Sequence, residues 1–338
     1  MFDPRRLSAA VDRFRGKTVL VVGDLIADEY VYGKPARISR EAPVLILRFS
    51  SREVRLGGAA NASHNVHALG ARVIPVGVLG SDPAGDEVWA LCRSLGISTE
   101  GVVRTGERGT PVKTRIMAGG YHSTRQQVIR VDREPLPVLD PATEGALIRR
   151  VATLGESADA ILLSDYGYGL LTPGILEQVM AVVRKRGSLV TADSRYDLLR
   201  FRGVTAATPN EPEVESLVGE PLEDEPALEK AGRTLLERLD CRYLLVTRGS
   251  KGMAVFEREG PATFLPIHGS DEIADVTGAG DTVISTFTLA LAAGSPPVEA
   301  AWLANVAGGV VVMKRGTAPI GRAELLHALA SDGTPREP

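Results

Sequence analysis

Apolar runs of strand length recur along the chain, and each ends at glycine or polar residues that favour a turn. These runs occupy residues 17–24, 71–80, 158–167, 187–194, 203–210 and 241–249. Stretches with helical periodicity lie between them, as at 85–96 and 226–239. This alternation predicts an α/β fold whose central sheet is mostly parallel, with helices on both faces. Ligands of such folds bind beyond the carboxyl ends of the strands.

Two segments, 28–58 and 110–135, interrupt the alternation. Both are rich in Val, Ile, Tyr and Arg, and neither shows a convincing helical pattern. We predict that they form a small β-sheet beside the main domain, where it serves as a lid or as a dimer contact. We expect residues 1–330 to form a single domain and residues 331–338 to form a disordered tail.

Composition and charge exclude several classes of protein. The formal net charge is −3 and the pI is about 6.0, so no overall positive field attracts nucleic acid or an anionic membrane. The N-terminal residues lack the apolar segment of a signal peptide, and no apolar run reaches the length of a membrane span. Cys92 and Cys241 are too few for a disulfide scaffold. We therefore expect a cytoplasmic protein that binds neither nucleic acid nor membranes.

One short motif, "DVTGAGDT" (275–282), places small residues and a carboxylate at the start of an apolar helical stretch. Gly278, Ala279 and Gly280 leave the backbone accessible, and the unpaired N–H groups of a helix N-terminus attract anions. Asp281 there could accept a hydroxyl proton while the amides stabilise charge on a phosphoryl group. The motif alone is equally compatible with a commoner role, an aspartate that caps a helix after a glycine turn.

Together with "RLGGAANASHNVHALGA" (55–71), this motif resembles the two signatures of the PfkB, or ribokinase-like, carbohydrate kinases. The resemblance covers roughly residues 17–325 and implies a three-layer α/β/α sandwich with a small β-sheet lid. Within the family, "VVGDLIADEYVYG", "RISREAPV", "RQQVIRVD" and "LLSDYG" look most like the kinases of D-glycero-β-D-manno-heptose 7-phosphate. The chain departs from that group at Tyr168, where many of its members carry lysine, and in the longer segment 118–127.

The resemblance assigns roles on the sugar side of the site. Asp281 would be the catalytic base, and the backbone of Gly278, Ala279 and Gly280 would form the anion hole. The residues implied in sugar binding are Asp28, Gly57, Gly58, Asn61 and Asp165. For the first four, a turn aspartate and a glycine turn into a helix are the alternatives that the residues alone leave open.

On the nucleotide side, the resemblance implies ATP and Mg²⁺ as cofactors. The residues implied in nucleotide binding are Asp193, Asn210, Thr247, Gly249, Gly252 and Asn305. Glu213 would help to hold Mg²⁺ through water, although "NEPE" also fits an asparagine-capped helix start. Backbone near Asp275 and Gly316 would bind a monovalent cation such as K⁺, as in many relatives.

A sugar that already carries a phosphate requires cations in its site. Arg37, Lys113, Arg125 and Arg130 lie in the two β-rich segments, so we expect the phosphate contacts among them. Each could equally be a solvated charge on an exposed sheet. We also expect a homodimer formed through the lid sheets, and closure of the lid over a bound sugar.

Other readings of the sequence have less support. His64 and His67 lie three residues apart on a predicted helix, but no third metal ligand is near them in the sequence. Neither GxGxxG, GxxxxGK[ST], GxSxG nor HExxH occurs. Two alternatives remain: a kinase of the same family that acts on a ketose, a ribose or a nucleoside, and a sugar sensor without catalysis.

Overall fold

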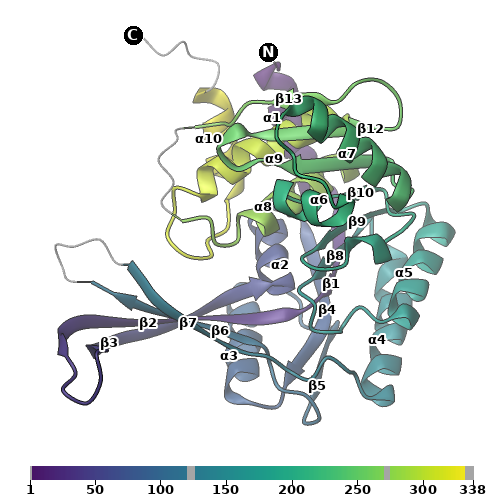
Figure 1. Ribbon diagram of the computed structural model, residues 1–338. Coiled ribbons are helices and arrows are strands. Elements are labelled where there is room, and N and C mark those ends of the chain that lie inside the picture. Colours follow the sequence, from purple (N-terminus) through teal and green to yellow (C-terminus); the bar gives the residue numbers. More distant parts are fainter. Residues whose placement is uncertain (1, 120–125, 270–274, 332–338) are drawn as a thin grey trace, which may run out of the picture.

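The computed structural model describes residues 2–119, 126–269 and 275–331. Its centre is a sheet in the order β13-β12-β11-β10-β9-β8-β1-β4-β5 (Figure 1). Adjacent strands from β5 to β11 pair in parallel, and β12 and β13 pair antiparallel at one edge. These strands are β1 (Thr18–Gly23), β4 (Arg72–Gly80), β5 (Val102–Thr105), β8 (Ala160–Asp165), β9 (Leu189–Ser194), β10 (Ala206–Ala207), β11 (Tyr243–Thr247), β12 (Met253–Glu257) and β13 (Thr263–Leu265).

Side chains of the central strands alternate between two apolar cores, one on each face of the sheet. In β1, Val19 and Val21 belong to one core, whereas Leu20 and Val22 belong to the other. Because both faces are buried, the strand reads as a continuous apolar run and not as an alternating one. The predicted α/β fold class is therefore confirmed, although the run at 203–210 contributes only the two-residue strand β10.

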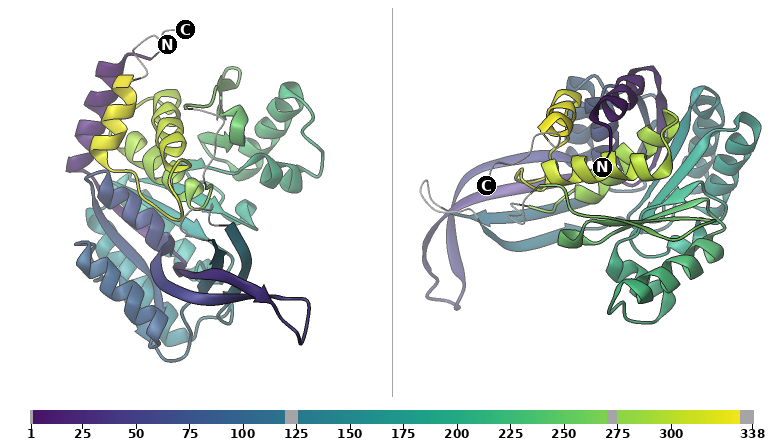
Figure 2. Two further views of the ribbon diagram at one scale, coloured as in Figure 1. Left: turned by 90° about the vertical axis from the view of Figure 1, so that its left-hand side faces the viewer. Right: turned by 90° about the horizontal axis from the view of Figure 1, so that it is seen from above.

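Helices cover both faces of the sheet (Figure 2). One face carries α1 (Pro4–Asp12), α2 (Ala59–Ala68), α3 (Pro83–Ser94), α8 (Ala279–Ala292), α9 (Pro297–Val311) and α10 (Arg322–Ser331). The other carries α4 (Pro141–Leu154), α5 (Pro173–Arg186), α6 (Glu211–Val218) and α7 (Glu225–Leu239). Short 3₁₀ helices lie at Arg13–Gly16, Gly155–Ser157, Leu198–Arg200 and Gly249–Lys251.

A second sheet extends away from the body in the order β3-β2-β6-β7 (Figure 1). Its strands are β2 (Leu25–Ile38), β3 (Leu45–Gly58), β6 (Val112–Ala118) and β7 (Gln126–Arg133). The half of β2 near the body is buried, but its far half, from Lys34 to Ile38, is exposed. We call this sheet the lid. It begins at Leu25, directly after β1, so its root lies at the carboxyl edge of the central sheet.

The predicted tail begins at Ser331, which the structure places at the end of α10, and residues 332–338 lie outside the described part of the chain. Among the described residues, no helix is long and apolar enough to cross a membrane.

Candidate active site

Asp281 lies in the first turn of α8, at the carboxyl edge of the central sheet, and only 2% of it is exposed. Both oxygens of its carboxylate accept a hydrogen bond. Asn61 Nδ2 donates to Oδ2 at 2.7 Å, and the Tyr166 hydroxyl donates to Oδ1 at 3.0 Å. Burial raises the pKa of Asp281 to about 7, against the lowering effect of these two donors. A carboxylate with such a pKa is suited to general base catalysis near neutral pH.

The turn before α8 depends on glycine. Gly278 has φ +80°, and a Cβ at this position would lie 2.6 Å from Asn61 Nδ2. Glycine is therefore required both by the backbone conformation and by the approach of Asn61 to the turn. Gly280 has open space around the position of a Cβ, and with Ala279 it lines a cavity on the other side of the turn.

Asp28 lies near the body end of β2 and pairs with Arg115 of β6, whose Nη1 is 2.7 Å from Asp28 Oδ1. Both side chains are buried. A Cβ at Gly57 would lie 2.8 Å from the Asp28 carboxyl group, so this glycine makes room for the carboxylate. Gly58, with φ +56°, is the N-cap of α2, the helix that carries Asn61.

A cavity of about 280 Å³ joins Asp28 to Asp281. We call it the sugar cavity, after the ligand that the sequence resemblance implies for Asp28 and Asp281. Its other lining residues are Ile26, Gly58, Lys113, Arg115, Arg130, Tyr166, Arg195, Val276, Thr277, Gly278 and Thr317. The Thr317 hydroxyl is buried and has no hydrogen-bond partner among the described residues. An unpaired buried hydroxyl in a polar cavity is a suitable partner for a hydroxyl group of a ligand.

Four cationic side chains line the sugar cavity, and two of them have an acidic partner among the described residues. Arg115 pairs with Asp28, and Arg130 binds Asp132 through two hydrogen bonds of 2.9 Å. Lys113 and Arg195 form no ion pair with any described residue. Instead, Lys113 Nζ lies 4.5 Å from the centre of the Tyr166 ring. Burial, followed by the charge of Arg195, lowers the pKa of Lys113.

The predicted phosphate contacts therefore separate. Lys113 and Arg130 line the sugar cavity, whereas Arg37 is exposed on the far half of β2 and does not line it. Arg125 lies outside the described residues. Arg115 and Arg195 were not predicted. Arg115 faces the cavity because β2 and β6 pair in parallel, with Tyr30 opposite Arg115, and that register cannot be read from the local sequence.

Asp165 is the last residue of β8 and Asp193 is the last but one of β9, but neither lines the sugar cavity. Asp165 accepts hydrogen bonds from the Gly167 backbone at 3.1 Å and from the Ser194 hydroxyl at 2.8 Å, so it fixes the loops around it. Asp193 lies near both Glu213 and Asp281. Lost hydration, then the charge of these two carboxylates, raises the pKa of Asp193 to about 8.

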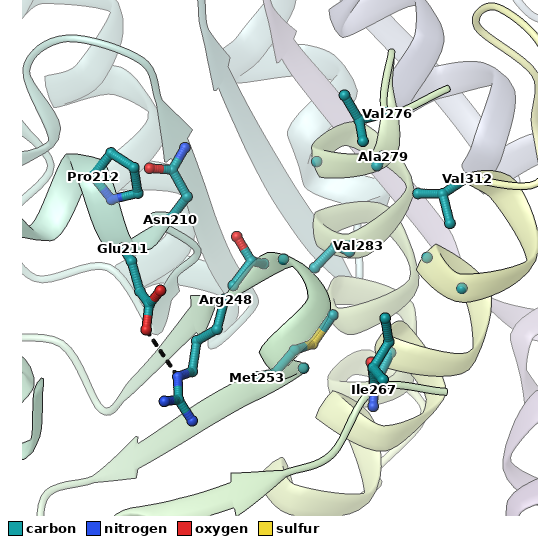
Figure 3. A pocket seen from close by; sticks show the side chains of 17 residues that line it. Asn210, Glu211, Pro212, Arg248, Met253, Ile267, Val276, Ala279, Val283 and Val312 are labelled. Atoms are coloured by element: carbon teal, nitrogen blue, oxygen red, sulfur yellow. Dashed lines mark hydrogen bonds and ion pairs between the residues drawn. The ribbon is translucent and has the colours of Figure 1, made fainter. Parts of the chain in front are cut away.

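A larger cavity, of about 550 Å³, lies on the other side of the α8 turn (Figure 3). We call it the nucleotide cavity. Val276 lines both cavities, so they meet at this turn. The remaining lining residues are Asn210, Glu211, Pro212, Thr247, Arg248, Gly249, Gly252, Met253, Ile267, Ala279, Gly280, Val283, Asn305, Gly308, Gly309 and Val312. Its charged side chains pair with each other, as Arg248 Nε donates to Glu211 at 3.0 Å.

All predicted nucleotide residues except Asp193 line this cavity. Thr247 ends β11, and Gly249 and Gly252 follow it with φ values of +55° and +86°. A Cβ at Gly252 would lie 2.1 Å from a backbone oxygen, which excludes any other residue there. The amide of Asn305 donates to the Pro266 carbonyl at 2.6 Å, so this side chain also holds a wall of the cavity.

Asn210 and Glu213 form a capping box at the start of α6. Each side chain accepts a hydrogen bond of 2.9 Å from the backbone of the other residue. The predicted helix start is therefore present, and the second carboxylate oxygen of Glu213 stays available. The described residues contain no group of three His, Cys, Asp or Glu side chains placed to hold a metal, His64 and His67 included. Glu213 therefore suits a Mg²⁺ ion that keeps its water ligands and takes further ligands from phosphates.

The loop around Gly316 contacts the guanidinium group of Arg55. Asp275 accepts from the backbones of Thr277 at 2.9 Å and of Gly316 at 2.8 Å. Arg55 Nη1 donates to the carbonyls of Arg315 at 2.7 Å and Thr317 at 3.4 Å, which flank Gly316. A guanidinium group on these carbonyls opposes the binding of a second cation there, so this loop fits a monovalent ion poorly.

A scan against family models matches "pfkB family carbohydrate kinase" over residues 17–322. The chain belongs to the pfkB family. It is 42% identical over 329 residues to a bifunctional protein HldE of Mesorhizobium japonicum, a match that covers 97% of this chain and 65% of the relative. A bifunctional protein HldE of Geobacter sulfurreducens is 40% identical over 311 residues, covering 92% of this chain and 62% of the relative. The chain thus spans less than two thirds of these relatives.

Solved structures of pfkB-type kinases share the fold. Ribokinase of Arabidopsis thaliana, in complex with ribose and ATP, has a TM-score of 0.70 and 22% identity, and the match covers 93% of this chain and 98% of that one. Phosphofructokinase-2 of Escherichia coli, in complex with substrates and products, has a TM-score of 0.74 and 17% identity, with 93% and 99% covered. At these identities the match establishes the ribokinase-like fold, as the sequence predicted.

Proposed function

We propose that this kinase transfers the γ-phosphoryl group of ATP to a hydroxyl of a sugar that already carries a phosphate. The observation that carries the proposal is the place of Asp281 where the two cavities meet, with its carboxylate fixed by Asn61 and Tyr166. A sugar bound by Asp28 and Thr317 would present a hydroxyl to Asp281. A triphosphate in the nucleotide cavity would bring its terminal group to the α8 turn from the other side.

Catalysis in this arrangement would rest on position and charge. Phosphoryl transfer passes through a loose transition state, so the proton leaves the hydroxyl late and a carboxylate is a sufficient base. The backbone N–H groups of Gly278, Ala279 and Gly280 would stabilise charge on the transferred group. Mg²⁺, held through water by Glu213 beside Asp193, would neutralise charge on the phosphates. No monovalent ion forms part of the proposal, because Arg55 already contacts the carbonyls beside Gly316.

The proposed sugar is D-glycero-β-D-manno-heptose 7-phosphate, phosphorylated at O1. Two observations support it. Lys113 and Arg195 bring positive charge to the sugar cavity without an ion pair among the described residues, and a phosphate group would supply the missing partner. The relatives named HldE are about 40% identical, and the motifs of this chain resemble those of heptose 7-phosphate kinases. Closure of the lid, with a homodimer through the lid sheets, completes the proposal.

A coupled kinase assay over a panel of acceptors tests this function. The panel contains heptose 7-phosphate, the unphosphorylated heptose, fructose 6-phosphate, ribose and adenosine, each with Mg²⁺ and ATP. We expect kcat/KM for heptose 7-phosphate to exceed that for the unphosphorylated heptose by about 100-fold or more, since charge-assisted contacts to the phosphate are lost. Preference for ribose, adenosine or another unphosphorylated sugar would contradict the proposed substrate, and no transfer to any acceptor would contradict the kinase.

A further inference from the structure

We propose that Tyr166 is a positioning residue for the base: its hydroxyl fixes Oδ1 of Asp281 and favours the ionised form of that carboxyl group. The catalytic role of Tyr166 rests on the proposed kinase function. The effect of its hydroxyl on the Asp281 carboxyl group can be measured in the protein without substrates. Tyr166 directly follows β8 and lies within the motif "LLSDYG", but no role of its own was predicted for it from the sequence.

Two hydrogen bonds fix the carboxylate of Asp281. Asn61 donates to one carboxylate oxygen at 2.7 Å and Tyr166 to the other at 3.0 Å. A carboxylate that accepts on both oxygens cannot rotate without losing a hydrogen bond in a buried site, where such a loss is costly. The carboxylate plane is therefore fixed at the wall of the sugar cavity, which Asp281 and Tyr166 both line.

Tyr166 is itself held in place by hydrogen bonds to the backbone of its loop. Asp24, which is 3% exposed, accepts from the Tyr166 backbone at 2.9 Å and from the Tyr168 backbone at 3.3 Å. Arg108 donates to the Tyr168 carbonyl and, at 2.9 Å, to the Leu136 carbonyl. The loop after β8 is thus fixed by buried charges on both sides. Such anchoring positions a side chain more precisely than an exposed loop does.

Neighbouring charges affect the pKa values of both Asp281 and Tyr166. Asp28 on β2, Lys113 on β6 and Asp193 on β9 act on Asp281 or Tyr166 through their charge. Three further cations line the same cavity: Arg115 on β6, Arg130 on β7, and Arg195 after β9. Burial and then the charge of Asp28 raise the pKa of Asp281, whereas the Asn61 amide, the Tyr166 hydroxyl and the charge of Lys113 lower it. The pKa of Tyr166 is itself raised by burial and by the carboxylates, so its hydroxyl keeps its proton and acts as a donor.

Removal of the hydroxyl alone is the appropriate test. Tyr166→Phe keeps the ring under Lys113 and deletes one hydrogen bond to an ionised group. The pKa of Asp281 should rise by about one unit, since such bonds contribute about 1.5–3 kcal/mol before water replaces part of the loss. Carbon-13 NMR of the aspartate carboxyl groups, assigned by comparison with Asp281→Asn, measures this pKa without any substrate. Tyr243→Phe in β11 is the matched control.

The kinase assay gives a second readout. We expect the acid limb of the pH profile of kcat to move upward by the same shift, so that the rate falls about fivefold at pH 7 and recovers largely at pH 9. KM for ATP should not change. An unchanged Asp281 pKa in a folded Tyr166→Phe protein overturns the inference. If the pKa rises but the wild type phosphorylates no sugar, the proposed function fails while the positioning role stands.

Should Tyr166→Phe not fold, Asp24→Asn tests the same arrangement from the backbone side. It keeps the side-chain shape but weakens the acceptor for the Tyr166 and Tyr168 amides. We expect the Asp281 pKa to rise in this variant too, because Tyr166 loses its fixed place. An Asp281 pKa equal to that of the wild type would again overturn the inference.

Discussion

The two cavities on either side of the α8 turn are built by opposite means. The sugar cavity is the smaller one, and buried charges from the lid and the body line it, among them Asp28, Lys113 and Arg115. The nucleotide cavity has about twice the volume, and its walls are mostly apolar side chains and glycine backbone. Its charged side chains, Arg248 and Glu211, pair with each other, and Arg248 also pairs with Glu225. Selectivity should therefore lie on the sugar side, where charges are already positioned, and the nucleotide side should tolerate substitution.

The turn shared by the cavities should give the largest loss. Gly278→Ala forces a Cβ toward Asn61 at a positive φ, so it should lower kcat by about 100-fold, as removal of anion-hole donors does. Gly294→Ala is the matched control, because Gly294 has φ +82° at the other end of α8 and open space around it. Steady-state kinetics and urea denaturation of both variants separate the effects. Equal losses of activity would show that backbone strain alone is responsible.

On the sugar side, Lys113→Met should raise KM for heptose 7-phosphate by about 10- to 100-fold, since a charge-assisted contact to the phosphate is lost. KM for ATP should stay the same, because Lys113 does not line the nucleotide cavity. Arg37→Met on the exposed half of the lid is the control and should resemble the wild type. The reverse pattern, with a change at Arg37 and none at Lys113, would place the phosphate on the far half of the lid.

The free energy of unfolding should depend on pH because Asp281 is buried in the sugar cavity. The folded-state pKa of Asp281 is about 7, above the ordinary 3.8, so the folded protein binds more protons than the unfolded chain between these values. Stability from this group is present at low pH and is lost as the pH rises through 7. Asp281→Asn should therefore reduce the fall in unfolding free energy between pH 5 and 8 by about 2 kcal/mol.

Denaturant titrations at the two pH values measure this difference. Glu107→Gln, at an exposed position after β5, controls for the change of carboxylate to amide and should leave the fall unchanged. A fall that is the same in Asp281→Asn and in the wild type would mean that Asp281 ionises in the folded protein as it does in the unfolded chain.

The smallest effect is expected in the nucleotide cavity. Val312→Ala removes part of an apolar wall and should raise KM for ATP by about three- to tenfold, in line with about 1 kcal/mol for the lost contact area. KM for the sugar should not change. A larger effect than that of Lys113→Met on its own substrate would reverse the comparison between the cavities.

The same contrast explains how far the sequence could predict the structure. Strands β1, β4, β8 and β9 were recognisable because burial on both faces leaves a continuous apolar run. The α8 turn was recognisable because its small residues leave the backbone accessible and because "DVTGAGDT" resembles a family signature. Arg115 and Tyr166 could not be recognised in that way. Their roles depend on the pairing of β2 with β6 and on a hydrogen bond between residues 115 positions apart. Arg195 directly follows the end of β9, so its place at a strand end was a usable signal.

One measurement tests the central claim most directly: the turnover of Asp281→Asn with ATP and heptose 7-phosphate, together with calorimetric binding of each substrate. With the base removed and both cavities intact, kcat should fall by about 1,000-fold or more, while both dissociation constants stay within about threefold of the wild type. A variant that binds both substrates and turns over within tenfold of the wild type would show that phosphoryl transfer does not depend on Asp281.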